Sequence, residues 1–409
     1  MKPKKKENAS GNRRQFLTTS GAIFMMCFLK PLRGLAAAIE KQPFANGLRD
    51  LVKYPGKKAL MRISARPIHL ETPFKFFKDS VITPNDEFFV RYHLADSPLE
   101  VDLASYRLRI KGHVERELNL SLAEIKKLAK PVDLVAVNQC SGNSRGFSKP
   151  RVFGAQLGNG SMGNAKWTGI PLSAVLKSAG IKTGGKFVTF NGLDKPVLPS
   201  TPDFVKALSI ELAMGGEPIL AWAMNDVDIP LLNGFPLKLI VPGYYGTYWV
   251  KHLSEIEVLN HDFDGFFMST AYRLPDNDCE CLPPGTPASE THPIGKLKVR
   301  SFFTNLETGA KLKLKAATTV GGIAFDSGAG IAKVEISNDS GRTWQLAQLG
   351  DDLGNYSFRA WTYKFQPIKK GSIELLVKAT SRNGESQPIS ASWNPGGYQR
   401  NVIESLRLE

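Results

Sequence analysis

The chain has 409 residues, of which 42% are hydrophobic and 22% are charged, an ordinary balance for a folded globular protein. This composition excludes a disordered chain, and no apolar run of about eighteen residues follows the N-terminal region to suggest a polytopic membrane protein. The formal charge is +15, and residues 1–38 alone carry a net +7 of it. The remaining excess fits an acidic partner or a small anion better than nucleic acid, because basic residues are scattered and not interleaved with aromatic ones.

The first forty residues have the features of an export signal. Arg13 and Arg14 follow a basic stretch and precede an apolar run, and small residues at 35–38 suit a cleavage site. This pattern predicts a twin-arginine leader over residues 1–38 and a periplasmic protein that is exported folded, as proteins carrying a cofactor are. An amphipathic helix beginning near Arg13 is the alternative. A lipid anchor at Cys27 is not expected, because bulky methionines precede it, and no stable membrane anchor is predicted.

Residues 39–285 read as a mixed α/β region. Apolar runs at 132–137, 186–190 and 236–241 predict short buried strands, and helical spacing predicts helices at 121–130 and 171–179. Ser121 and Glu124 make a capping box at the start of the first helix. Glycine and proline punctuate the rest, so many residues must lie in ordered loops, where cofactor sites tend to occur.

The sequence pattern changes after a proline-rich linker near residues 279–293. Residues 292–409 alternate apolar and polar residues between turn signals, which predicts an immunoglobulin-like β-sandwich that serves dimerisation or supports the first domain. The fold class is therefore α+β. Cys279 and Cys281 are too close in sequence for a relaxed disulfide and lack a histidine at zinc-site spacing, so they are interpreted as structural. The predicted strands are 296–303, 311–317, 331–337, 344–348, 356–365 and 373–380.

Cys140 is the residue with the clearest chemical potential. It follows a buried apolar run and enters a loop of small polar residues, with Arg145 five positions later. Electropositive surroundings favour the thiolate, which can act as a nucleophile, a redox sensor or a soft metal ligand. The alternative is an inert core cysteine beside a Ser-Gly turn.

Several ordered motifs point to one family. Residues 138–145 read Asn-Gln-Cys-Ser-Gly-Asn-Ser-Arg and resemble the molybdenum-binding loop of the sulfite oxidase family. The resemblance covers nearly all of residues 70–409 and extends to the family's dimerisation domain. Its further motifs lie at 88–93, 162–171, 234–243, 248–251 and 270–273.

The resemblance implies roles for individual residues. Cys140 would bind molybdenum, which one molybdopterin also holds. Arg91 and Arg145 would pair with an oxyanion substrate, since guanidinium offers planar charge-assisted donors, and Tyr272 would donate a hydrogen bond there. The implied contacts to the pterin and its phosphate are His93, Asp194, Asn233, Lys238 and Lys251.

Each of these residues also has an ordinary structural reading. Arg91 could form a surface ion pair, Lys238 could extend along a strand to water, Tyr272 could pack in a loop and His93 could be a satisfied core histidine. Residues 156–158 lack the tryptophan that some family members place near the substrate, so the shape of the pocket differs there.

The implied activity is oxidation of sulfite to sulfate. The sequence has no Cys-x-x-Cys-His motif for c-type haem attachment, so the electrons are expected to pass to a separate c-type cytochrome. A homodimer through the C-terminal domain is the family expectation. Two alternatives stay open: a molybdenum reductase of sulfoxides such as protein methionine sulfoxide, and a non-catalytic binding protein of the same fold. Nitrate reduction is less favoured.

Overall fold

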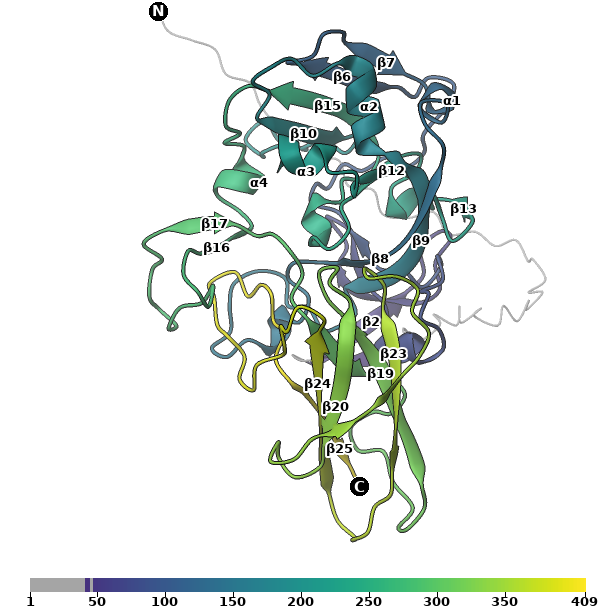
Figure 1. The fold of residues 1–409 in the computed structure, drawn as a ribbon, viewed down its shortest axis with the longest axis vertical. Coiled ribbons are helices and arrows are strands. Elements are labelled where there is room, and N and C mark those ends of the chain that lie inside the picture. Colours follow the sequence, from purple (N-terminus) through teal and green to yellow (C-terminus); the bar gives the residue numbers. More distant parts are fainter. Residues whose placement is uncertain (1–40, 45–46) are drawn as a thin grey trace, which may run out of the picture. The chain divides into compact units, whose positions relative to one another are not determined.

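The computed structural model describes residues 41–44 and 47–409, with side chains from Leu48 onward. The predicted leader lies outside the described residues. Within the described residues, no helix is both long enough and apolar enough to cross a membrane. The described residues belong to one compact unit, which Figure 1 draws as a ribbon.

Three sheets make up the first region of the chain. The first is an antiparallel sheet in the order β1-β2-β3-β4-β5, and the second, β11-β10-β15-β6-β7, is antiparallel except for the parallel pair β15 and β6. The third has the order β13-β12-β9-β8, with β14 also pairing with β12. The bounds are β1 (Lys41–Phe44), β2 (Gly47–Val52), β3 (Leu60–Ser64), β4 (His69–Glu71), β5 (Val90–Arg91), β6 (Leu108–Gly112), β7 (Leu118–Leu120), β8 (Val132–Gln139), β9 (Met162–Pro171), β10 (Phe187–Gly192), β11 (Lys206–Ser209), β12 (Ile219–Met224), β13 (Val227–Asp228), β14 (Lys238–Ile240) and β15 (Leu253–Leu259).

Short helices connect these strands. The capping box is confirmed, because Ser121 Oγ accepts from the Glu124 amide and Glu124 accepts from the Ser121 amide. The first helix is shorter than predicted: α1 ends at Ile125, and the next turns close by tighter i to i+3 bonds before Pro131. The bounds are α1 (Leu122–Ile125), α2 (Leu172–Ala179), α3 (Ile210–Met214) and α4 (Phe266–Ser269), with 3-10 turns η1 (Phe74–Lys78), η2 (Arg145–Phe147), η3 (Leu231–Asn233) and η4 (Gly246–Tyr248).

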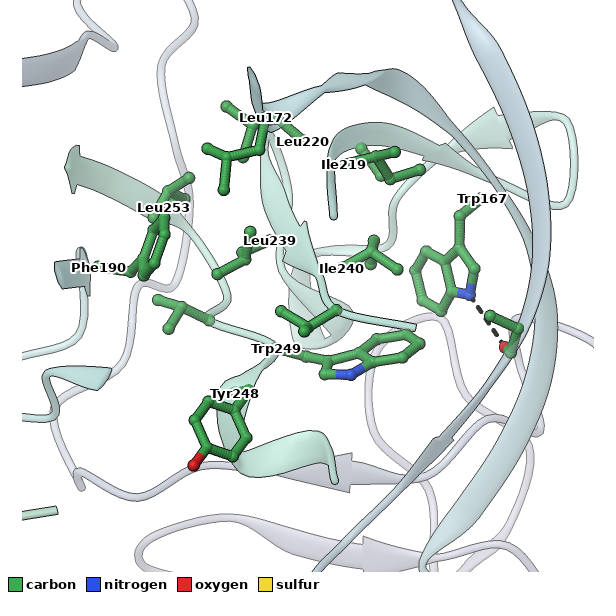
Figure 2. Close-up of a cluster of buried hydrophobic side chains, with 14 of the residues drawn as sticks. Trp167, Leu172, Phe190, Ile219, Leu220, Leu239, Ile240, Tyr248, Trp249 and Leu253 are labelled. Atoms are coloured by element: carbon green, nitrogen blue, oxygen red, sulfur yellow. Dashed lines mark hydrogen bonds between the residues drawn. The ribbon is translucent and has the colours of Figure 1, made fainter. Parts of the chain in front are cut away.

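The core of the first region lies between its second and third sheets. Figure 2 shows Leu172, Leu220, Leu239 and Leu253 filling this space, with Trp167 and Trp249 at one side of it. Both indoles also have polar partners, and the Trp167 Nε1 donates to the Ala136 carbonyl at 3.2 Å. The same core includes phenylalanines of the C-terminal region, such as Phe302 and Phe325, so the two regions share buried surface.

The C-terminal region contains two four-stranded sheets, whose strands run alongside one another in Figure 1. Val334, Trp361 and Val377 are among the fully buried residues between them. This arrangement agrees with the predicted β-sandwich. The bounds are β18 (Arg300–Phe303), β19 (Thr318–Phe325), β23 (Arg359–Phe365) and β22 (Gln348–Leu349) in one sheet, β21 (Gln345–Leu346), β20 (Ile331–Ser337), β24 (Ile373–Ser381) and β25 (Glu404–Leu408) in the other, and β16 (Arg273–Pro275) with β17 (Thr291–Pro293) before them.

Two sequence predictions in this part are wrong. Residues 311–317 alternate lysine with apolar residues, yet they form a loop in which Lys315 has a positive φ of 61°. The strand is the following segment, β19. Cys279 and Cys281 form a disulfide, because the left-handed backbone of Glu280 (φ 49°) folds the chain so that the two Cα atoms lie 5.1 Å apart.

Candidate active site

One cavity gathers most of the predicted site residues. Its lining surrounds about 630 Å³ of space, part of which is open to solvent. Cys140, Arg91 and Tyr272 line it together, although 181 positions separate the last two in sequence. The other predicted residues in its wall are His93, Asp194, Asn233, Lys238 and Lys251. Arg145 is the one predicted residue outside the lining.

Cys140 sits where β8 ends. Its amide donates to the Ser161 carbonyl at 2.9 Å, and its own carbonyl accepts from the Asn143 amide at 3.0 Å. The thiol is free and half-buried. Ser144 then adopts a left-handed conformation (φ 72°), which is uncommon for a residue with a side chain and often marks a functional loop. The sulfur is therefore fixed by backbone bonds that do not involve it.

Arg300 supports this loop from the C-terminal region, and no sequence motif indicates this contact. The guanidinium is fully buried on β18, where Nη1 donates to Ser144 Oγ at 3.0 Å and Nη2 pairs with Glu404 at 2.9 Å. Burial lowers the pKa of Arg300 to about 10, which leaves it charged at neutral pH. A buried cation of the β-sandwich thus supports the Cys140 loop through its hydrogen bond to Ser144.

Replacing Arg300 by alanine is expected to destabilise the protein by about 2–5 kcal/mol, because it empties a fully buried position and removes the bond to Ser144, while Glu404 keeps only its pair with Arg400. Chemical denaturation measures the change. The matched control is Arg407→Ala, which removes an exposed pair with Glu374 at 3.6 Å and should cost less than about 1 kcal/mol. Equal losses for the two variants would contradict this assignment.

Arg91, His93 and Tyr272 are three polar residues of the cavity wall. Arg91 ends β5, and His93 follows two residues later. The His93 Nε2 lies 2.6 Å from the Tyr272 hydroxyl, and the His93 ring stacks on Phe204 with centroids 3.6 Å apart. Burial lowers the pKa of His93 and raises the pKa of Tyr272. At neutral pH, Tyr272 therefore keeps its phenol proton and His93 is a neutral imidazole.

Neither predicted substrate arginine has a carboxylate partner. Throughout residues 48–409, no carboxylate oxygen lies within ion-pair distance of Arg91 or Arg145. An uncompensated guanidinium at a half-buried position is costly unless an anion arrives to pair with it. Arg91 therefore gives the cavity the character of an anion site.

In residues 48–409, the cavity lysines Lys238 and Lys251 also have no carboxylate oxygen within ion-pair distance. The Lys251 Nζ is buried over the Tyr92 ring and has no hydrogen-bond partner among the described residues, and the Lys238 Nζ lies 4.6 Å from the Trp167 ring centre. Burial lowers the pKa of Lys251 well below its usual value and that of Lys238 to about 7. The Asp194 carboxylate opposes the shift at Lys251, while its own pKa is raised by burial.

Asn233 is held by a residue that the motifs do not include. The Lys57 Nζ donates to Asn233 Oδ1 at 2.6 Å and to the Phe88 carbonyl at 3.0 Å, while the Asn233 amide donates to the Phe89 carbonyl. Lys57 thus ties η3 to the segment that carries Arg91. Its sequence neighbourhood has no distinctive pattern, so only the fold reveals this contact.

Arg145 lies beside the cavity rather than in its wall. Its Nε donates to the Gly396 carbonyl at 2.8 Å, and its guanidinium carbon is 5.0 Å from the ring centre of Tyr398. Tyr398 in turn stacks on Tyr272, with centroids 5.5 Å apart. Both Gly396 and Tyr398 belong to the C-terminal region, outside the sequence motifs at 88–273.

Comparison with known proteins identifies the family. A profile described as "Oxidoreductase molybdopterin binding domain" matches residues 94–267, and one described as "Mo-co oxidoreductase dimerisation domain" matches residues 291–404. Sulfite oxidase of Gallus gallus is 32% identical over 90% of this chain and 81% of its own length. The chain belongs to the sulfite oxidase family.

Another family member and a solved structure support the family assignment and the fold. The mitochondrial sulfite oxidase of Drosophila melanogaster is 29% identical over 87% of this chain, which spans 64% of that longer protein. The crystal structure of the sulfane dehydrogenase SoxCD from Paracoccus pantotrophus shares the fold, with a TM-score of 0.72 at 20% identity, over 94% of this chain and 93% of that one. The predicted fold class, a molybdopterin-binding domain followed by a sandwich, is confirmed.

As a sulfite oxidase family member, the chain is a molybdenum oxidoreductase that uses molybdopterin. Its cavity fits that cofactor. Polar atoms of cavity residues are buried without hydrogen-bond partners in the described part of the chain: Asn138 Oδ1, Ser141 Oγ, Thr247 Oγ1 and Lys251 Nζ. Buried polar atoms are normally satisfied, so this cluster calls for a polar ligand. Lys251 and Lys238 can pair with a phosphate, and the Cys140 thiolate is a soft donor suited to molybdenum.

The buried lysines give the cofactor-free protein a distinctive pH dependence. Because the pKa of Lys238 falls to about 7 on folding, the unfolded chain binds more protons between pH 7 and the usual lysine pKa. Stability is therefore lowest below pH 7 and rises with pH above it, by up to about 1.4 kcal/mol per pH unit for each such lysine. Urea unfolding of cofactor-free protein at pH 7.5 and 9.0 measures this rise. Lys238→Met should make the dependence less steep, and an unchanged slope in that variant would contradict the argument.

Proposed function

We propose that this enzyme oxidises sulfite to sulfate. The observation that carries the proposal is the convergence of Cys140, Arg91 and Tyr272 on one cavity, with an arginine that has no carboxylate partner in the described structure. A doubly charged oxyanion matches such a site, because planar guanidinium donors form paired charge-assisted bonds to its oxygens. Sulfite oxidase of Gallus gallus, which is 32% identical, supports this choice of anion.

The proposed cofactor-binding residues differ in the part of the cofactor that their side chains would contact. Cys140 would hold the metal through its thiolate. Lys238 and Lys251 would pair with the phosphate of the pterin, which explains why two lysines are buried without a carboxylate contact. Asn233, oriented by Lys57, and Asp194 present amide and carboxylate groups to the cavity, where they would contact the pterin.

The reaction also needs a route for protons. Sulfite and water give sulfate, two protons and two electrons, and the bound cofactor supplies the two-electron redox change. Arg91 would orient the substrate anion toward the Cys140 side of the cavity. Tyr272, whose pKa burial raises, keeps its proton at neutral pH and donates it as a hydrogen bond. His93, 2.6 Å away and neutral, is positioned to exchange protons with it.

The partners follow from the same proposal. We propose that the electrons pass to a separate c-type cytochrome, since residues 1–409 contain no Cys-x-x-Cys-His motif for attaching a c-type haem. The twin-arginine pattern in residues 1–38 supports export to the periplasm, where such an acceptor would meet the enzyme. The dimerisation profile over residues 291–404 supports a homodimer.

The test is anaerobic mixing of the purified, molybdenum-loaded enzyme with sulfite or with methionine sulfoxide. Sulfite is expected to bleach the metal–thiolate absorption, and added cytochrome c should then be reduced. If sulfite leaves the spectrum unchanged while a pre-reduced enzyme is reoxidised by the sulfoxide, the enzyme is a reductase and the proposal fails. Absence of molybdenum from protein made in a competent host would point instead to a non-catalytic binding protein.

A further inference from the structure

The C-terminal region sends one loop, residues 393–400, across the edge of the active site. The Trp393 Nε1 donates to the Pro150 carbonyl at 2.8 Å, which attaches the start of this loop to the segment that follows Arg145. Gly397 adopts a left-handed conformation (φ 57°), and a Cβ there would lie 2.8 Å from the Arg145 Cγ. The loop therefore packs closely on the aliphatic part of Arg145.

Arg145 is confined from several sides. Its Nε is bound by the Gly396 carbonyl, and a Cβ on Gly142 would lie 2.9 Å from the guanidinium carbon. A Cβ on Gly154 would lie 2.8 Å from Nη1. Glycine at 142 and 154 thus leaves room for the guanidinium, which a side chain at either position would contact. A planar group held this way keeps one orientation.

Tyr398 is the side chain that connects Arg145 to the cavity. Its ring centre is 5.0 Å from the Arg145 guanidinium carbon and 5.5 Å from the ring of Tyr272, with 22° between the two ring planes. Tyr272 lines the cavity and contacts His93. One aromatic ring therefore touches both a cation and the phenol that are proposed to meet the substrate.

An aromatic ring and a carboxylate can both orient an arginine, but they differ in their effect on its positive charge. A carboxylate would orient the guanidinium but would also neutralise its field toward the cavity, whereas a ring attracts the cation through its quadrupole and leaves the positive charge intact. No carboxylate pairs with Arg145 within the described range, so its charge stays available to an anion. The neighbouring carboxylate, Glu404, is already engaged by Arg300 and Arg400.

We propose that Tyr398 is a positioning residue of the oxyanion site. Its ring contacts the guanidinium of Arg145 and the ring of Tyr272 and so fixes their relative positions. It does this without neutralising the positive charge of Arg145. This inference rests on the proposed function of Arg145 and Tyr272. It assigns a part of the active site to the C-terminal region, so that region does more than support or dimerise.

The experiment compares Tyr398→Phe, which keeps the ring, with Tyr398→Leu, which removes it. Tyr398→Leu is expected to raise the KM for sulfite and weaken the binding of sulfate, measured by calorimetry, by about ten-fold each, the effect of losing one partly buried cation–π contact. Tyr398→Phe should stay within about two-fold of the wild type, because the face of the ring remains. Molybdenum content should not change in either variant.

A double-mutant cycle separates positioning from packing. If Tyr398 acts through Arg145, then Tyr398→Leu adds no further loss of sulfate binding in an Arg145→Gln background. Additive losses overturn the proposal, and so does unchanged sulfate binding in Tyr398→Leu. Should that variant fail to fold, Tyr398→Met fills the same space without a ring. Misfolding of both would assign Tyr398 to the core and also overturn the proposal.

Failure of the proposed function gives a different result. A wild-type enzyme that contains molybdenum but does not oxidise sulfite would refute the substrate assignment. Sulfate binding in the Tyr398 variants would still report whether the ring positions Arg145 for an oxyanion.

Discussion

Replacing Cys140 by serine is expected to lower sulfite turnover by more than about 100-fold, since even residues that only orient metal ligands contribute about 10–100-fold. A serine hydroxyl is a hard, protonated donor at neutral pH and cannot replace a soft thiolate on molybdenum. The loop should keep its shape, because the amide and carbonyl of Cys140 make its structural bonds, to Ser161 and Asn143. Turnover and circular dichroism of the same preparation measure both effects.

The matched control for this change is the same substitution elsewhere in the chain. Cys279→Ser combined with Cys281→Ser removes the disulfide in an exposed turn, outside the cavity lining. It is expected to leave turnover close to that of the wild type. Substantial sulfite oxidation by Cys140→Ser would refute the assignment of Cys140 as the metal ligand.

Replacing Arg91 by glutamine is expected to lower kcat/KM for sulfite by about 30-fold or more, because removing one partner of a partly buried charged pair costs about 2–5 kcal/mol. Glutamine keeps donors of similar reach but has no charge. Arg91 has no competing carboxylate in residues 48–409, so its full charge is available to the anion. Steady-state kinetics over a range of sulfite concentrations measure the loss.

Arg109→Gln provides the control for lost positive charge. Arg109 lies on β6 and pairs with Glu117 at 3.4 Å, and both side chains are more than half exposed. Its removal should change kcat/KM by less than about two-fold, since exposed ion pairs contribute little. A similar loss in both variants would mean that general electrostatic attraction, rather than direct binding, explains the role of Arg91.

Much of the candidate site could be predicted because its residues lie in short ordered motifs. The stretch around Cys140 and the one carrying Arg91 and His93 resemble known family segments, and the structure brings both to one cavity. The supporting residues could not be predicted. Lys57, Arg300 and Tyr398 act across 176, 156 and more than a hundred positions of sequence, so only the folded chain brings them near Asn233, Ser144 and Tyr272.

Some strands of the fold could likewise be predicted from the sequence, and others could not. Strands with regular alternation, such as β20 and β24, could be predicted from sequence alone. The sequence pattern does not predict β19, because Gly321 and Gly322 interrupt its run of apolar residues. In the structure, Gly322 lies against the Phe302 carbonyl and the Trp361 indole, so there is no room for a side chain. The lysine-rich segment before it has the alternation of a strand, but it forms a loop.

X-ray absorption at the molybdenum edge tests most directly whether the sulfur of Cys140 binds molybdenum. The spectrum of the loaded Cys140→Ser variant is expected to show one fewer sulfur neighbour at molybdenum than that of the wild type. An identical sulfur count in the two proteins would contradict the account.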